Sequence, residues 1–291
     1  MPIQNILEGQ VKDLGGFSVR RILPNTRQRM VGPWIFFDHM GPAEFKSGEG
    51  INVRPHPHIN LATVTYLFEG EILHRDSLGN HQLIRPGEIN LMVAGSGITH
   101  SERESDETRN TVHKQHGLQL WHALPEKDEE TNPTFYHYSY TDLPAVTIEG
   151  VPVRVLMGSA YGVTSPVISF SEILYIEAQL QSSQILPLPQ AAEAAIYIVE
   201  GKVYIQGNEL QQYQMMTMDN SGELTVTAAQ ESQIVVIGGE PLGERHIYWN
   251  FASSRKERIE QAKQDWREGR FAKVKGDEIE FIPLPDDIAS R

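Results

Sequence analysis

The chain has 291 residues, of which 40% are hydrophobic and none is cysteine. This length allows two domains or one large one, and the apolar fraction can fill a sizeable core. Without cysteine, disulfides, thiolate nucleophiles and thiolate metal ligands are excluded, so any metal must be held by histidine and carboxylate. The formal net charge of −13 repels phosphate backbones, and we expect no direct binding of nucleic acid.

The sequence gives no sign of a membrane or secretory segment. It has no apolar run of about 18 residues, the length that a spanning helix needs. The opening stretch MPIQNILEGQVKDLGG lacks the basic and apolar regions of a secretory signal. We therefore expect a cytoplasmic protein without membrane contact.

Short segments rich in β-branched and aromatic residues recur along the chain, separated by turns of Gly, Pro and Asn. They predict strands at 17–23, 63–68, 82–84, 118–121, 153–157, 173–178, 195–199 and 234–237. Many short strands of this kind are typical of a sandwich or barrel.

One segment near the end has helical spacing instead. Ser254 and Glu257 fit a capping box, and Ile259 and Ala262 follow on one helical face before Gly269. The pattern predicts a helix that packs against the outside of a barrel. The tail FIPLPDDIASR is expected to be extended.

An internal repeat organises the chain. TVTYLFEGEI at 63–72 is echoed by AAIYIVEGKV at 194–203, an offset of 131 residues. The repeat predicts two domains: 1–140, which would hold the metal, and 141–291, a second copy followed by the helix and the tail. The offset places Pro187 and Pro189 opposite His56 and His58, and no histidine occurs at 138–245. The second copy therefore lacks histidine ligands.

The candidate site begins with two histidines in RPHPH at 54–58. An extended segment points residues i and i+2 to the same side, and the flanking prolines favour extended backbone, so His56 and His58 should share a face. His100 and Glu102, in GSGITHSERES, have the same spacing. If the two pairs converge inside one barrel, three imidazoles and one carboxylate would leave open positions on a divalent transition metal. This donor set suits iron, which we favour, and also Mn, Ni, Co, Cu or Zn.

At this point the residues resemble a known family. The stretch from HPHINLATVTYLFEGE to GSGITHSE, then HGLQLWHALP at 116–125 and the earlier VGPWIFFDHM at 31–40, is similar to the pirin family of bicupins. The ending WNFASSRKERIEQAKQDW resembles that of the longer bacterial members. The resemblance implies an all-β fold of two tandem cupin β-barrels of jelly-roll type with a short C-terminal helix. It also implies one metal, usually iron, held by His56, His58, His100 and Glu102.

The chain departs from the family at one place. The family pattern continues H-R-G-F-E after the first histidine pair, whereas Ile59, Asn60, Leu61 and Ala62 follow His58 here. Ala62 stands where other cupins have a carboxylate ligand, which leaves Glu102 to supply the oxygen donor.

Two functions are compatible with this site. Some family members resemble quercetin 2,3-dioxygenases, which implies that a flavonol binds the metal and that Glu102 acts as the general base toward its hydroxyl. The alternative is a non-enzymatic, iron-dependent redox sensor that binds a regulatory protein; a metal-free structural bicupin is a third possibility. His74 and His116 lie in the family-like stretch, either as hydrogen-bond partners of the ligands or as core residues.

Overall fold

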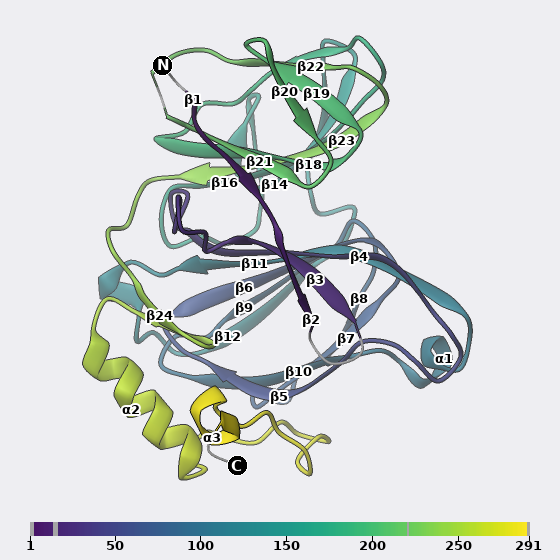
Figure 1. The fold of residues 1–291 in the computed structure, drawn as a ribbon. Helices are drawn as coiled ribbons and strands as arrows, with labels where there is room; N and C mark the ends of the chain where they lie inside the picture. Colours follow the sequence, from purple (N-terminus) through teal and green to yellow (C-terminus); the bar gives the residue numbers. More distant parts are fainter. Residues whose placement is uncertain (1–2, 14–16, 220, 290–291) are drawn as a thin grey trace. The chain divides into compact units, whose positions relative to one another are not determined.

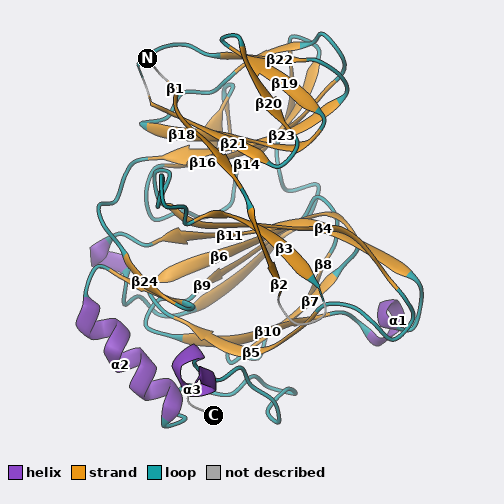
Figure 2. Ribbon diagram, in the orientation of Figure 1, coloured by secondary structure: helices purple, strands orange, loops and turns teal. Residues whose placement is uncertain are grey.

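The computed structural model describes residues 3–13, 17–219 and 221–289, and most of them lie in β-strands (Figure 2). The chain forms two compact units. The first comprises the chain up to Val11, Arg20–Asp38 and Tyr138–Leu242, and the second comprises Lys12–Val19, His39–His137 and the chain from Gly243. The predicted division between residues 140 and 141 stays a prediction about sequence domains.

The second unit is built on two antiparallel sheets (Figure 1). Strands of the smaller sheet, in spatial order, are β5 (Asn52–His58), β10 (Ile98–Arg103), β7 (Ile72–Asp76) and β8 (His81–Ile84). Neighbouring strands of the larger sheet are β12 (Thr134–Tyr138), β9 (Ile89–Val93), β6 (Leu61–Glu69), β11 (His113–Ala123) and β4 (Trp34–Phe45). Strand β6 is buried from Leu61 to Leu67, which places the middle of the larger sheet in the core.

The first unit repeats this arrangement. Its larger sheet contains β1 (Ile3–Glu8), β21 (Gln214–Asp219), β18 (Glu193–Glu200), β23 (Ser232–Gly239), β16 (Ile173–Leu180), β14 (Val151–Ala160) and β13 (Ala145–Ile148), with β15 (Val163–Thr164) beside β14. Its smaller sheet contains β17 (Ile185–Pro187), β22 (Thr225–Ala228), β19 (Lys202–Ile205) and β20 (Asn208–Gln211). Apolar side chains from both sheets form one buried cluster, as in a jelly roll.

The strand orders confirm the predicted pair of cupin units. The order β9-β6-β11-β4 in the second unit corresponds to β21-β18-β23-β16 in the first, and β5-β10-β7-β8 corresponds to β17-β22-β19-β20. Each predicted strand corresponds to an observed one; the strand predicted at 17–23 is β3 (Ser18–Leu23), which begins one residue later than predicted. The chain passes between the units within β2 (Gln10–Asp13), β3, β4 and β12, and again after Leu242.

The C-terminal segment, from Gly243 onward, packs against the rest of the second unit. A hairpin of β24 (His246–Tyr248) and β25 (Phe251–Ser253) leads into helix α2 (Lys256–Arg267). Ile259 and Ala262 of α2 join Ile59, Phe251 and Leu284 in a buried cluster, which confirms the expected helix and its packing. The short helices α1 (Asp106–Arg109) and α3 (Pro285–Ala289) and a 3-10 turn at Glu126–Asp128 complete the structure. Among the described helices, none is long and apolar enough to span a membrane.

Two details of this segment differ from the expectation. The N-cap residue of α2 is Arg255, and no side chain caps the helix, because the Ser254 hydroxyl donates to the buried Glu129 carboxylate at 2.9 Å. The predicted capping box is therefore wrong. The tail is not extended at 285–289, where it forms α3: Pro285 at the first helical position and Asp286 and Asp287 in the first turn favour a helix start.

Candidate metal centre

Strands β5 and β10 bring the candidate ligands together. The two strands pair antiparallel, and their register sets His100 opposite His56 and Ile98 opposite His58. Because His56 and His58 are two apart on β5, both rings point to the same face as His100. All three histidines are buried.

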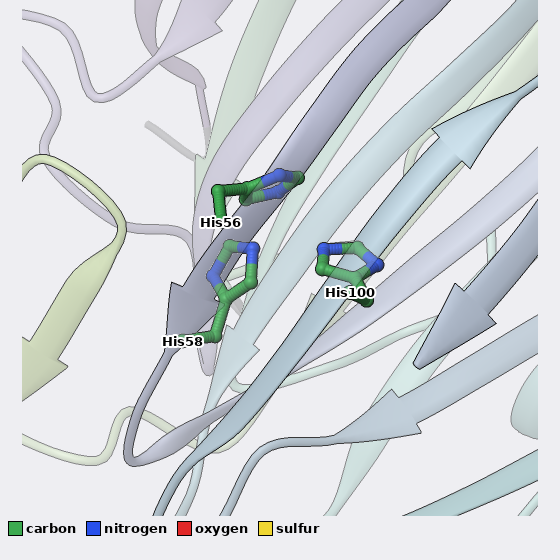
Figure 3. A group of neighbouring side chains, drawn as sticks. All are labelled: His56, His58 and His100. Atoms are coloured by element: carbon green, nitrogen blue, oxygen red, sulfur yellow. The ribbon is translucent and has the colours of Figure 1, made fainter. Parts of the chain in front are cut away.

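The three imidazole rings surround one point (Figure 3). The ring centroids of His56 and His100 lie 4.4 Å apart, and those of His58 lie 5.0 Å from each of the other two. One nitrogen from each ring lies within 4.8 Å of the others, so the three histidines could hold one metal ion.

Hydrogen bonds determine which nitrogen carries the hydrogen in two of these rings. Nδ1 of His56 donates to the carbonyl of Arg54 at 2.9 Å, and Nδ1 of His58 donates to the carbonyl of Asn250 at 3.1 Å. A carbonyl can only accept, so in the neutral rings Nε2 carries a lone pair. The Nε2 atom of His100 is buried and has no hydrogen-bond partner among the described residues.

Burial keeps the three rings neutral. It lowers the pKa of His56 to about 4, and it holds the pKa values of His58 and His100 well below the ordinary value of histidine. Neutral imidazole is the form that binds a metal. Buried lone pairs without donors are costly, and a transition metal that accepts nitrogen ligands would satisfy them. The residues present therefore fit such a metal.

Glu102 lies on the same strand, but a β-bulge separates it from His100 in the pairing with β5. Its Oε1 lies 3.5 Å from the Thr65 hydroxyl, and burial raises the pKa of its carboxyl group to about 7. It is not a member of the three-histidine group. Its assignment as fourth ligand and base stays a prediction.

The two additional histidines have different surroundings. Nδ1 of His74 lies 3.4 Å from Nδ1 of His100, so His74 contacts the site from β7. His116 instead lies against His39, with their Nε2 atoms 2.7 Å apart, and against the ring of Phe68. Of the two residues, only His74 has a described contact with the three-histidine group.

The turn from β5 to β6 accounts for one residue of the departure from the family pattern, Asn60. Asn60 has φ of +60°, the left-handed region where asparagine is the best substitute for glycine. Its side-chain Nδ2 donates to Glu129 Oε2 at 3.0 Å and to the Ser253 hydroxyl at 3.2 Å. Ala62 lies directly opposite His122 on β11. The hydrogen bond from Asn60 to Ser253 therefore connects the turn after β5 to the C-terminal segment.

Sequence reasoning missed the role of that C-terminal segment. The candidate ligand His58 is oriented by a backbone carbonyl 192 residues away, at Asn250. The segment is anchored nearby by a buried ion pair in which Arg245 Nε lies 3.0 Å from Glu129 Oε1. A carbonyl carries no side-chain signal, so no sequence pattern marks it.

Comparisons with known proteins agree with this structure. The family model described as Pirin matches residues 16–122, and the model of the Pirin C-terminal cupin domain matches residues 174–272. A pirin-like protein of Caulobacter vibrioides is 45% identical, covering 98% of this chain and all of the relative, and human pirin is 30% identical, covering 91% and 92%.

The same agreement extends to a solved structure. The crystal structure of quercetin 2,3-dioxygenase from Acinetobacter baumannii has a TM-score of 0.89 and 34% identity, covering 98% of this chain and 96% of that one. Two family models, the close relatives and the shared fold lead to one conclusion: the chain is a member of the pirin family, with its buried histidine group in the cupin unit that the pirin model matches.

Proposed function

We propose that this protein is an iron-dependent flavonol 2,3-dioxygenase of the quercetinase type. The metal would be held by His56, His58, His100 and Glu102. The observation that supports this most is the convergence of three buried imidazoles. The hydrogen bonds of Nδ1 leave a lone pair on Nε2 of His56 and of His58, and Nε2 of His100 has no hydrogen-bond partner among the described residues. Likeness to a solved quercetin 2,3-dioxygenase supports the choice of substrate.

The reaction consumes one O2 for each carbon monoxide released as the flavonol heterocycle opens. Iron, when bound, would supply Lewis acidity toward the substrate oxygens and electron exchange with O2. Glu102 would take the proton of the flavonol 3-hydroxyl on a carboxylate oxygen. Its pKa of about 7 in the metal-free protein suits a general base near neutral pH. Trp121, whose ring meets His58 edge-on at 5.0 Å, would shield this region from water.

Anaerobic loading with Fe(II), addition of quercetin and then of air tests the proposal. We expect loss of flavonol absorbance with carbon monoxide in equal amount. The His56→Ala variant should lose this turnover, whereas the variant Pro187→Ala, changed at the corresponding place in the other unit, should keep it. Wild-type protein that holds iron but releases no carbon monoxide would rule out the dioxygenase.

A second function, redox-dependent binding of a regulatory protein, is supported by one surface feature. A cavity of about 660 Å³ under the C-terminal segment is lined by Pro55 and Thr99, the neighbours of ligands His56 and His100. Ile279 and Phe281 beside it are 95% and 57% exposed, an apolar surface that a partner could cover. A change of iron charge could reach this surface through β5 and β10.

Hydrogen exchange distinguishes the two functions. If the protein signals through this surface, segment 271–284 should exchange at different rates in the Fe(II) and Fe(III) forms. Identical exchange in both forms, together with flavonol turnover, would leave only the enzyme.

A further inference from the structure

His100 is contacted, on the ring nitrogen away from the other two histidines, by a short chain of buried polar groups. Its Nδ1 lies 3.4 Å from Nδ1 of His74, and Nε2 of His74 lies 3.0 Å from Oδ2 of Asp76. All three residues are buried, with Asp76 fully so. The ring of His74 also stacks on Phe135, with centroids 4.4 Å apart and an angle of 17° between the planes.

Asp76 is held in place at one end of this series of hydrogen-bonded groups. Its Oδ1 accepts from the backbone N–H groups of Leu78 and Asn80 at 2.9 and 3.0 Å, and its Oδ2 accepts from the Asn80 side chain at 2.9 Å. These donors belong to the turn between β7 and β8, so they hold the carboxylate in one position. A carboxylate with this many donors is ionised and can only accept.

The donor and the acceptor of each hydrogen bond in this series follow from the ionised carboxylate of Asp76. Because Asp76 accepts, Nε2 of His74 must carry a hydrogen, and in a neutral imidazole Nδ1 then carries a lone pair. The group that faces this lone pair is Nδ1 of His100, which must donate. The lone pair of His100 is then on Nε2, the atom that has no hydrogen-bond partner among the described residues.

We propose that Asp76 and His74 act as positioning residues that fix the proton of His100 on Nδ1 and so present its Nε2 lone pair to the metal. His56 and His58 reach the same state by donating to backbone carbonyls, whereas His100 has a side-chain relay. Metal-bound imidazoles in proteins commonly donate their other N–H to an oriented acceptor. The inference rests on the proposed metal site, but the protonated nitrogens exist without the metal and can be observed in its absence.

The direct test is ¹⁵N NMR of histidine-labelled, metal-free protein at pH 7.5. Long-range proton–nitrogen correlations distinguish the Nδ1–H form of a neutral ring from the Nε2–H form, and the variants His74→Asn and His100→Gln assign the two spin systems. We expect His74 in the Nε2–H form and His100 in the Nδ1–H form. The opposite form of either ring, or a doubly protonated His74, overturns the proposal.

Three substitutions test the consequence for metal binding, measured as Co(II) affinity and as the visible spectrum of bound Co(II). In Asp76→Asn the new amide can donate to Nε2 of His74, which would move the His74 proton to Nδ1 and set two donors against each other. In His74→Phe the ring and its stacking on Phe135 remain, but the acceptor is lost. Each should weaken Co(II) binding by about 10- to 100-fold and change the spectrum. In His74→Asn a side-chain oxygen can replace the lost acceptor, and affinity should recover toward wild type.

Two controls separate positioning from folding and from the proposed function. Phe135→Leu removes the stacking without touching the relay, and it should leave the His100 Nδ1–H form unchanged. Should Asp76→Asn fail to fold, the comparison of His74→Phe with His74→Asn still decides, since equal affinities in those two variants contradict the relay. If wild-type protein binds no metal at all, the metal site is wrong, while the NMR result still shows whether the relay sets the proton.

Discussion

At Asn60 the chain takes a left-handed turn directly after the ligand strand, and the residue has two separate tasks. Its backbone needs the tolerance for positive φ that glycine and asparagine share, and its side chain binds Glu129 and Ser253 in the core. Glycine, the residue of the usual pirin pattern, could perform only the first task. The departure from the family is therefore linked to the C-terminal segment, which supplies Ser253.

Substitution of Asn60 should separate the two tasks. Asn60→Gly keeps the turn but loses the buried hydrogen bonds, at a cost of about 1–3 kcal/mol in the free energy of unfolding. Asn60→Ala loses both and should cost a further ~1–2 kcal/mol, because a β-carbon is strained at positive φ. Urea unfolding of the two variants checks this, and equal stabilities would contradict the role given to the backbone.

His122 gives a prediction about pH. Burial lowers its pKa to about 4, so the folded chain keeps this ring neutral while the unfolded chain, with an ordinary pKa near 6.5, takes up a proton. The unfolded state binds more protons between these values, so stability is full above about pH 6.5 and falls as the pH drops toward 4, by roughly 3 kcal/mol for this one group.

The measurement is urea unfolding of metal-free protein at pH 7.5 and 4.5. His122→Phe removes the titrating group and should lose less stability between the two pH values than wild type does. His81→Asn, a change at an exposed histidine, is the matched control and should follow wild type. A pH dependence that His122→Phe leaves unaltered would refute the assignment.

The elements show which parts of the structure the sequence could predict. The strands were predictable because their β-branched residues and their turns are local signals, and α2 was predictable from its spacing. The convergence of His56, His58 and His100 was predictable because two i, i+2 pairs on strands place side chains on one face. The cap of α2 was not, because Ser254 binds Glu129, a partner 125 residues away that local spacing does not reveal.

The bulge between His100 and Glu102 limits prediction in the same way. In an ideal strand the side chains of His100 and Glu102 would point to the same face of the sheet, but the register with β5 shifts between these residues. Such a shift depends on the partner strand, and the sequence of β10 alone does not specify it. Sequence spacing therefore predicts the histidines more securely than the carboxylate.

The buried ion pair between Arg245 and Glu129 anchors the C-terminal segment, so its loss should destabilise the protein. Both side chains are 1% exposed, and Glu129 also accepts from Asn60 and from Ser254. Arg245→Met should leave a buried carboxylate without its cation and cost about 3–5 kcal/mol in the free energy of unfolding. Removing both charges with Arg245→Met and Glu129→Gln should cost less than the two single changes together, and simple additivity would contradict the pairing.

Across the whole molecule, two units share one strand order but only one has the histidine group. In the first unit, the position that corresponds to His56 is Pro187, on the short strand β17, and the chain from 138 to 245 contains no histidine. The duplicated fold therefore does not imply a duplicated site. The difference lies in a few side chains on one sheet rather than in the architecture.

We therefore expect one metal ion per chain. Elemental analysis of untagged protein should give a ratio near one, which falls close to zero in His100→Ala and stays unchanged in Pro187→Ala. A ratio near two, or metal retained by His100→Ala, would place metal outside the histidine group.

The carbonyl of Asn250 that orients His58 has a consequence for the order of events during synthesis. The proposed ligands at 56, 58 and 100 leave the ribosome long before residue 250 does. Until then the His58 ring has no fixed acceptor for its Nδ1 proton. Mature affinity for the ion should thus arise only after residue 250 has left the exit tunnel, so we expect metal capture to follow the synthesis of the segment that contains Asn250.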